Sequence, residues 1–108
     1  LGYLPQEKEI YKSGLGDLVQ RLNSENQAEV LGVVEDFERL DERMDSMFKI
    51  LDGEAPKVFV GKSPVTRSPN LSVIADIFEG EDGNFLLMAI GPTRMDYQKV
   101  LGWFKELK

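Results

Sequence analysis

One segment of the sequence, Gly91-Pro92-Thr93-Arg94-Met95-Asp96-Tyr97, gathers the side chains that are best placed to do chemistry. The Arg94 guanidinium could pair with a carboxylate on another domain or subunit, or it could be an internal clamp that bonds backbone carbonyls or an acid such as Asp96. We favour the internal role, because a turn from a strand into a helix leaves backbone carbonyls that need donors. Thr93 and Asp96 are predicted to cap the following helix, as a variant of the capping box.

Catalytic and metal chemistry have little support elsewhere in the sequence. Cysteine and histidine are both absent, which removes thiolate nucleophiles, histidine bases and Cys/His zinc sites. Glu79, Glu81 and Asp82 could offer oxygen ligands to a hard cation, but they lack the spacing of a calcium loop. We therefore expect no metal and no cofactor. Without a nucleophile–base pair or a metal cluster, the sequence predicts a protein that is not an enzyme.

Two predicted elements must position the 91–97 segment. Residues 85–90 are apolar without alternation, which is typical of a central strand buried on both faces. Residues 97–108 have the spacing of an amphipathic helix. Its buried face is predicted to contain Tyr97, Val100, Leu101, Phe104 and Leu107, with Trp103 beside it. Gly91 and Pro92 are expected to set the backbone of the turn, because glycine adopts angles closed to other residues and proline fixes its own φ.

The longest predicted helix runs from a capping box at Ser24 and Gln27 to Leu51. Its apolar residues recur at alternating spacings of three and four: Val30, Val33, Phe37, Leu40, Met44, Met47 and Leu51. The helix could lie across the sheet of its own chain, or it could form a coiled coil with a second copy, with Phe37 and Met44 at the interface. Further apolar residues widen the stripe, which favours the core of a single chain.

The remaining pattern predicts an antiparallel sheet. Strands are expected at residues 9–12, 57–61 and 71–78, and the last of these should form a hairpin with residues 85–90. A short helix is expected at residues 14–22, whereas residues 1–7 read as irregular. The fold class is therefore α+β: an antiparallel sheet with the long helix and the C-terminal helix packed on it, in a single domain of residues 1–108.

Composition and charge bound the possible functions. A chain of 108 residues with 42% hydrophobic and 30% charged residues is typical of one globular domain. No apolar run reaches the length of a membrane span, and the start lacks a signal-peptide pattern, so we expect no membrane contacts. The absence of cysteine fits the cytoplasmic location that we expect. The chain does not begin with Met, which suggests a part of a longer protein. A net charge of −6 argues against DNA binding by this chain alone, because binding to the DNA phosphates requires a basic protein surface.

The 91–97 segment, with Gln98-Lys99-Val100 after it, closely resembles the end of the heat-inducible transcription repressor family, HrcA. Other similar segments are Ile10-Tyr11 with Gly14-Leu15, residues 58–62, and the strand that begins at Leu71. The resemblance runs from about Glu9 to Lys105. One departure is Ser63-Pro64, which stands where the family commonly has Glu-Asn.

This resemblance implies a function. Family members repress chaperone genes as dimers through an N-terminal winged helix-turn-helix that binds an inverted-repeat operator, and the chaperonin promotes their active form. This chain resembles only the C-terminal part of their GAF-like domain, without the inserted dimerisation domain, so operator DNA would be bound through a winged helix outside this chain. A homodimer and the chaperonin are the expected partners.

The candidate interface residues are Arg94, Trp103, Phe37 and Met44. The alternative function is a small-molecule sensor domain, because GAF-like folds often hold ligands in a pocket on the sheet. A deep pocket with convergent polar groups would favour the sensor, whereas a flat apolar patch would favour the interaction domain.

Overall fold

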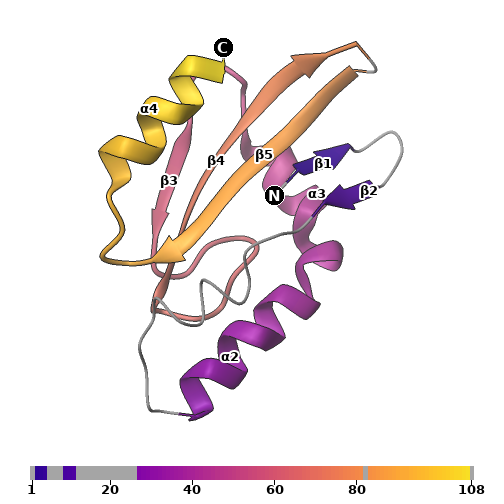
Figure 1. The fold of residues 1–108 in the computed structure, drawn as a ribbon. Coiled ribbons are helices and arrows are strands. Elements are labelled where there is room, and N and C mark those ends of the chain that lie inside the picture. The colour runs from indigo at the N-terminus through magenta and orange to yellow at the C-terminus, as the bar shows by residue number, and fades with distance from the viewer. Residues whose placement is uncertain (1, 5–8, 12–26, 82, 108) are drawn as a thin grey trace.

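The computed structural model describes residues 2–4, 9–11, 27–81 and 83–107, and its centre is an antiparallel sheet (Figure 1). Its five strands are ordered β2-β1-β5-β4-β3. The strands are β1 (Gly2–Leu4), β2 (Glu9–Tyr11), β3 (Lys57–Val60), β4 (Leu71–Gly80) and β5 (Gly83–Pro92). The helices are α2 (Gln27–Glu38), α3 (Leu40–Ile50) and α4 (Tyr97–Leu107). The predicted α+β class and antiparallel sheet are confirmed.

The hairpin of β4 and β5 is the longest pairing in the sheet. It runs from Leu71 opposite Pro92 to Gly80 opposite Gly83. The prediction that residues 85–90 are buried on both faces is wrong, because β5 has half-buried residues between its buried ones. The strand buried on both faces is β4, whose residues 71–76 are all buried. The reason is that α4 packs on β4, while β4 also faces the core on the other side of the sheet.

Strand β1 was not expected. It pairs with β2 and also with β5, where Gly2 lies opposite Leu87 and Tyr3 opposite Leu86. A short segment before a proline carries little pattern of its own, and the unpaired edge of β5 supplies hydrogen-bonding partners that the local sequence does not reveal. The predicted strand at 9–12 is confirmed as β2. The predicted helix at 14–22 and the capping residue Ser24 lie outside the described residues.

The long predicted helix is divided into α2 and α3 at Arg39. The Arg39 amide donates to the carbonyls of both Glu35 and Asp36, at 3.1 and 3.2 Å, and a new helix begins at Leu40. Neither glycine nor proline stands at this position, and the apolar spacing continues through it. We attribute the division to tertiary contacts, because the Asp36 side chain is bonded to the loop after β3 while α3 follows the sheet.

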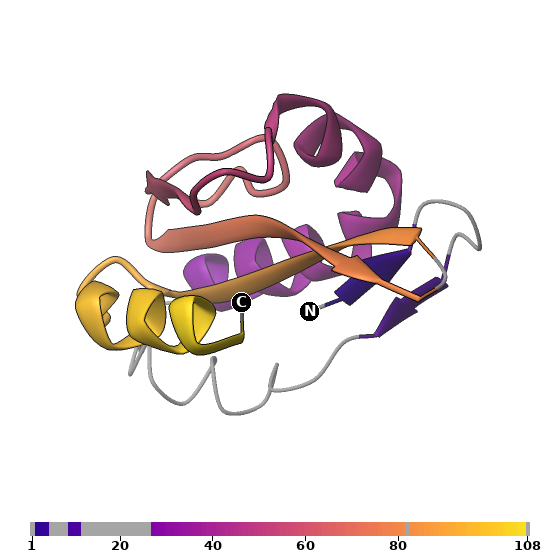
Figure 2. The same ribbon diagram turned by 90° about the horizontal axis from the view of Figure 1, so that it is seen from above.

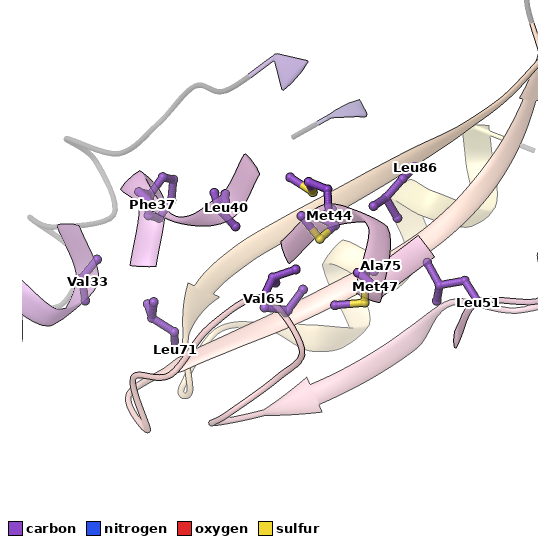
Figure 3. Close-up of a cluster of buried hydrophobic side chains, with 12 residues drawn as sticks. Val33, Phe37, Leu40, Met44, Met47, Leu51, Val65, Leu71, Ala75 and Leu86 are labelled. Carbon is purple, nitrogen blue, oxygen red and sulfur yellow. The ribbon is translucent and has the colours of Figure 1, made fainter. Parts of the chain in front are cut away.

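Two separate cores lie on the two faces of the sheet. The larger core joins α2 and α3 to one face (Figure 3). It contains Val33, Phe37, Leu40, Met44 and Met47 from the helices, and Leu51, which follows α3. Val65, from the loop between β3 and β4, is fully buried in the same core. The smaller core joins α4 to the other face through Ile74, Phe78 and Phe104. Figure 2 shows α3 and α4 on opposite sides of the sheet.

Candidate functional site

The turn before α4 is closed by Asp96. Helix α4 begins at Tyr97, and the amide of Lys99 donates to Asp96 Oδ1 at 3.1 Å, so the predicted capping role of Asp96 is confirmed. The predicted capping role of Thr93 is wrong, because Thr93 lies too far before the helix. Its backbone holds the turn instead: the Thr93 amide donates to the carbonyl of Asn70 at 3.1 Å.

Tyr97 ties the turn to the sheet through its hydroxyl group. The hydroxyl donates to the Thr93 carbonyl and lies 2.8 Å from Ser72 Oγ, with which it also forms a hydrogen bond. Ser72 is fully buried in β4, and its Oγ accepts the amide of Gly61 at 3.3 Å. One tyrosine therefore connects the start of α4, the middle strands and the end of β3.

Gly91 is needed for space rather than for unusual backbone angles. It is buried in β5, and it is not among the described glycines with positive φ. A Cβ atom at this position would lie only 2.7 Å from the Met95 sulfur. Met95 folds back over the glycine, and its amide donates to the Pro92 carbonyl at 2.9 Å. The close packing of Met95 therefore explains the glycine.

Arg94 is the exposed residue at the tip of this turn. The carbonyls of Pro92 and Thr93 accept hydrogen bonds from Met95 and Tyr97, so these two acceptors do not depend on the guanidinium. Whether Arg94 acts inside the chain or toward another subunit stays a prediction.

The outer face of α4 carries a row of exposed residues spaced four apart: Lys99, Trp103 and Leu107. Trp103 is 53% exposed and Leu107 is 63% exposed. The Lys99 ammonium lies 5.4 Å from the centre of the Trp103 ring, a cation–π contact. The prediction that Leu107 is buried is wrong, because the last turn of α4 places it in line with Trp103. The other two candidate interface residues, Phe37 and Met44, are buried in the larger core of the single chain.

A cavity of ≈ 310 Å³ lies between α4, the segment before β3 and strand β4. It is lined by Glu54, Ala55, Pro56, Asp76, Leu101, Phe104 and Lys105. Asp76 is fully buried, and one of its carboxylate oxygens accepts the amide of Ile77 at 2.8 Å. The sequence analysis did not single out Asp76, although a lone acid inside an apolar strand is a recognisable signal for a buried charge.

A second polar cluster, also not predicted, surrounds Asp36, which is only 3% exposed. Its Oδ1 accepts Arg43 Nη1 and the Arg67 amide, each at 2.9 Å, and its Oδ2 accepts the Ser68 amide at 2.9 Å. Arg43 Nη1 also donates to the Val65 carbonyl at 2.9 Å. The sequence signal would have been the spacing of seven residues, which places Asp36 and Arg43 on one side of the helices. This cluster fixes the loop that contributes Val65 to the larger core.

The loop also contains the departure from the family pattern at Ser63-Pro64. Ser63 Oγ accepts the amides of Val65 and Thr66 at 3.2 and 3.0 Å, and it lies 2.8 Å from Thr66 Oγ1. The hydroxyl of Ser63 therefore stabilises a tight local turn. In this chain the position has a structural role.

Within residues 2–4, 9–11, 27–81 and 83–107, no three acidic residues gather closely enough to hold a metal ion. None of the helices in this described part is both long and apolar enough to cross a membrane.

Comparison with known proteins identifies the family. No curated protein and no solved structure gave a match. The family model described as HrcA protein C terminal domain matches residues 2–101. The match begins with β1 and contains the whole turn from Gly91 to Tyr97, but it ends before Trp103. Because it covers nearly all of the sequence, the chain belongs to the HrcA C-terminal domain family.

Proposed function

We propose that this chain is the regulatory and interaction domain of a transcription repressor of chaperone genes. The observation that carries the proposal is the family match over residues 2–101. The repressor would act in the cytoplasm as a homodimer, and the chaperonin would promote its active form. Operator DNA would be bound by a winged helix-turn-helix outside these residues, since this chain has a net charge of −6.

Two exposed features are the proposed contact points. Arg94, at the tip of the turn, offers a planar guanidinium to a carboxylate of another subunit or domain. Trp103 and Leu107 offer exposed apolar surface on α4, and aromatic residues are enriched at protein interfaces. The Trp103 proposal rests on this exposure, since the family match ends at residue 101. Phe37 and Met44 would affect assembly only indirectly, through the stability of the core.

The test compares the isolated chain with the full-length repressor. Fluorescence anisotropy at physiological salt should show no sequence-specific binding of the isolated chain to the chaperone-gene operator, because phosphate contacts need basic residues. The full-length protein should bind, and deletion of the region corresponding to residues 1–108 should release repression in a reporter strain. Specific operator binding by the isolated chain, or full repression without it, would contradict the proposal.

Interface variants refine this test. In the full-length repressor, Trp103→Gln combined with Leu107→Gln should weaken repression and binding to the chaperonin or to the second subunit. Leu31→Gln is the matched control, since Leu31 is 67% exposed on α2, away from α4. Equal repression by both variants would show that the outer face of α4 is not a contact surface.

The second candidate function is a small-molecule sensor domain of the GAF-like kind. The cavity beneath α4 favours it, because its ≈ 310 Å³ volume falls near the lower limit of about 300 Å³ for ligand pockets. A sensor would bind its ligand in the isolated chain and change operator affinity only in the full-length protein.

A further inference from the structure

Strand β3 forms one edge of the sheet that the structure describes, with β4 as its neighbour in the strand order. Val58 lies opposite Ile74, which belongs to the smaller core beneath α4. Phe59 lies opposite Val73, which belongs to the larger core on the other face. Residues two apart in a strand share a face, so Val60 lies with Val58 on the α4 side of the sheet.

Both valines at this edge are exposed to solvent, Val58 at 41% and Val60 at 66%. An edge strand also has backbone N–H and C=O groups that point away from its neighbour, and these groups can pair with a further strand. Natural edges are often protected by charged residues, proline or a bulge. In β3 the charged residue is Lys57 at the first position, and the register with β4 runs without a bulge. The centre of β3 therefore lacks these protective features.

The sequence of β3 suits antiparallel pairing with a second copy of itself. A two-fold axis perpendicular to the sheet, between two Phe59 residues, places Val58 of each copy directly opposite Val60 of the other. The four valines then form one apolar cluster between the two α4 helices, since such an axis keeps each face of the sheet on its own side.

The charges of β3 select this register among its neighbours. With Phe59 at the axis, the two Lys57 residues lie four positions apart, about 13 Å along the strands, which exceeds the ~8 Å screening length at physiological salt. A shift of two residues in one direction brings the two lysines closer together. A shift in the other direction places Val58 opposite the exposed Lys62.

We propose that β3 pairs antiparallel with β3 of a second copy, so that two five-stranded sheets become one continuous sheet. The inference rests on the proposed homodimer and names a contact surface for it. Two short strands bury less area than the ~1,600 Å² of a standard interface, so the isolated chain forms this dimer at high protein concentration. In a full-length homodimer, other contacts raise the effective concentration of the two strands.

Sedimentation equilibrium of the isolated chain, from about 10 μM to about 1 mM, tests the pairing. The unchanged chain should show a monomer–dimer equilibrium. Val60→Lys should weaken dimerisation about tenfold or more, because the pairing would bury the new charge against Val58 of the second copy. Leu31→Lys is the matched control on α2, where Leu31 is 67% exposed, and it should dimerise like the unchanged chain. A chain that stays monomeric, or equal dimerisation of the Val60→Lys variant, would overturn the proposal.

A mixture of two variants tests the register. Val58→Glu should weaken dimerisation as Val60→Lys does, because each variant buries a charge against a valine. An equal mixture of the two should dimerise about tenfold more strongly than either alone, since the new lysine of one chain lies opposite the new glutamate of the other. Thermal melts verify that both variants fold. A mixture that dimerises no better than its components would overturn the proposed register.

Amide hydrogen exchange of the unchanged chain gives a second measurement that needs no variant. Exchange at residues 57–60 should slow as the protein concentration rises, because edge amides gain partners, whereas residues 31–36 of α2 should exchange at a constant rate. Equal exchange of residues 57–60 at all concentrations would overturn the proposal. A monomeric chain would leave the repressor proposal to the operator and reporter assays, and failure of those assays would leave a measured β3 dimer standing.

Discussion

The two faces of the sheet are built differently. On one face, α2 and α3 cover a continuous core that includes Val65 from a loop, and the buried Asp36 carboxylate fixes that loop. On the other face, α4 covers a smaller core with a cavity beside it, and its outer side exposes Trp103 and Leu107. On the α2/α3 face, the Asp36 carboxylate is bonded to Arg43 and to the loop within the same chain. The α4 face has exposed apolar residues and a cavity whose lining includes Glu54 and Asp76.

This difference suggests that the two faces of the sheet have different roles, one in stability and one in binding. Native cores are packed closely with few voids. On the α2/α3 side the described residues include a pocket of ≈ 210 Å³ beside the Asp36 cluster, which is smaller than the cavity of ≈ 310 Å³ beneath α4. A cavity and exposed apolar residues reduce stability, and both are more common at binding sites. The proposed contacts place the recognition role on the α4 face, whereas the bonded Asp36 cluster favours a structural role for the α2/α3 face.

The largest expected effect comes from truncation of the tighter core. Phe37→Ala should lower the free energy of unfolding by roughly 3–5 kcal/mol, because the side chain is buried among well-packed neighbours. The matched change Phe104→Ala should cost less, about 3 kcal/mol or below, since Phe104 already borders a cavity. Urea unfolding of both variants measures the difference. A Phe37→Ala chain of unchanged stability that only loses dimerisation would restore the coiled-coil interpretation.

The second effect concerns two adjacent acids that each pair with an arginine. Asp36→Asn should cost roughly 1–3 kcal/mol, because it removes the charge that binds Arg43 and two loop amides in a buried site. Glu35→Gln should cost about 0.5 kcal/mol or less, because the Glu35–Arg39 pair, at 3.4 Å, is solvent-exposed. Chemical denaturation of both variants provides the measurement. Equal losses would mean that the buried cluster does not stabilise the α2/α3 face.

The sequence predicts a structural feature well when contacts between neighbouring residues determine it, and poorly when contacts between distant segments do. Amphipathic periodicity identified the stripe from Val33 to Leu51 and helix α4, and the cap at Asp96 follows from neighbouring residues. The division of the long helix at Arg39 could not be predicted, because it depends on bonds from Asp36 to a loop about thirty residues later. The cavity was missed for the same reason, since Ala55, Asp76 and Leu101 come from three separate segments.

The third prediction concerns the turn that joins the sheet to α4. Tyr97→Phe should lower stability by about 1 kcal/mol, because the Thr93 carbonyl and the Ser72 hydroxyl lose a shared partner. Arg94→Ala should change stability by less than about 0.5 kcal/mol, since Arg94 is exposed. Thermal melts of the isolated domain, paired with a repression assay of the full-length protein, separate the two roles. A melting temperature lowered more by Arg94→Ala than by Tyr97→Phe would return Arg94 to an internal structural role.

The smallest effect involves Asp52, an exposed carboxylate that also binds an amide of the chain following it. Asp52 Oδ1 accepts the Glu54 amide at 2.9 Å, and this bond lowers the pKa of Asp52 from its usual 3.8, with a smaller contribution from Lys57. A carboxyl whose pKa is lower in the folded chain stabilises the fold above its unfolded pKa, and this stabilisation is lost as the pH falls through the folded value. Asp52→Asn keeps the shape and an acceptor oxygen but removes the charge. Its melting temperature should therefore be slightly below that of the unchanged chain at pH 7, and the two should converge as the pH falls below the usual carboxyl range. A melting-temperature difference that persists unchanged into strong acid would mean that the charge of Asp52 does not stabilise this turn. The corresponding change at the buried Asp36, Asp36→Asn, should lower stability much more.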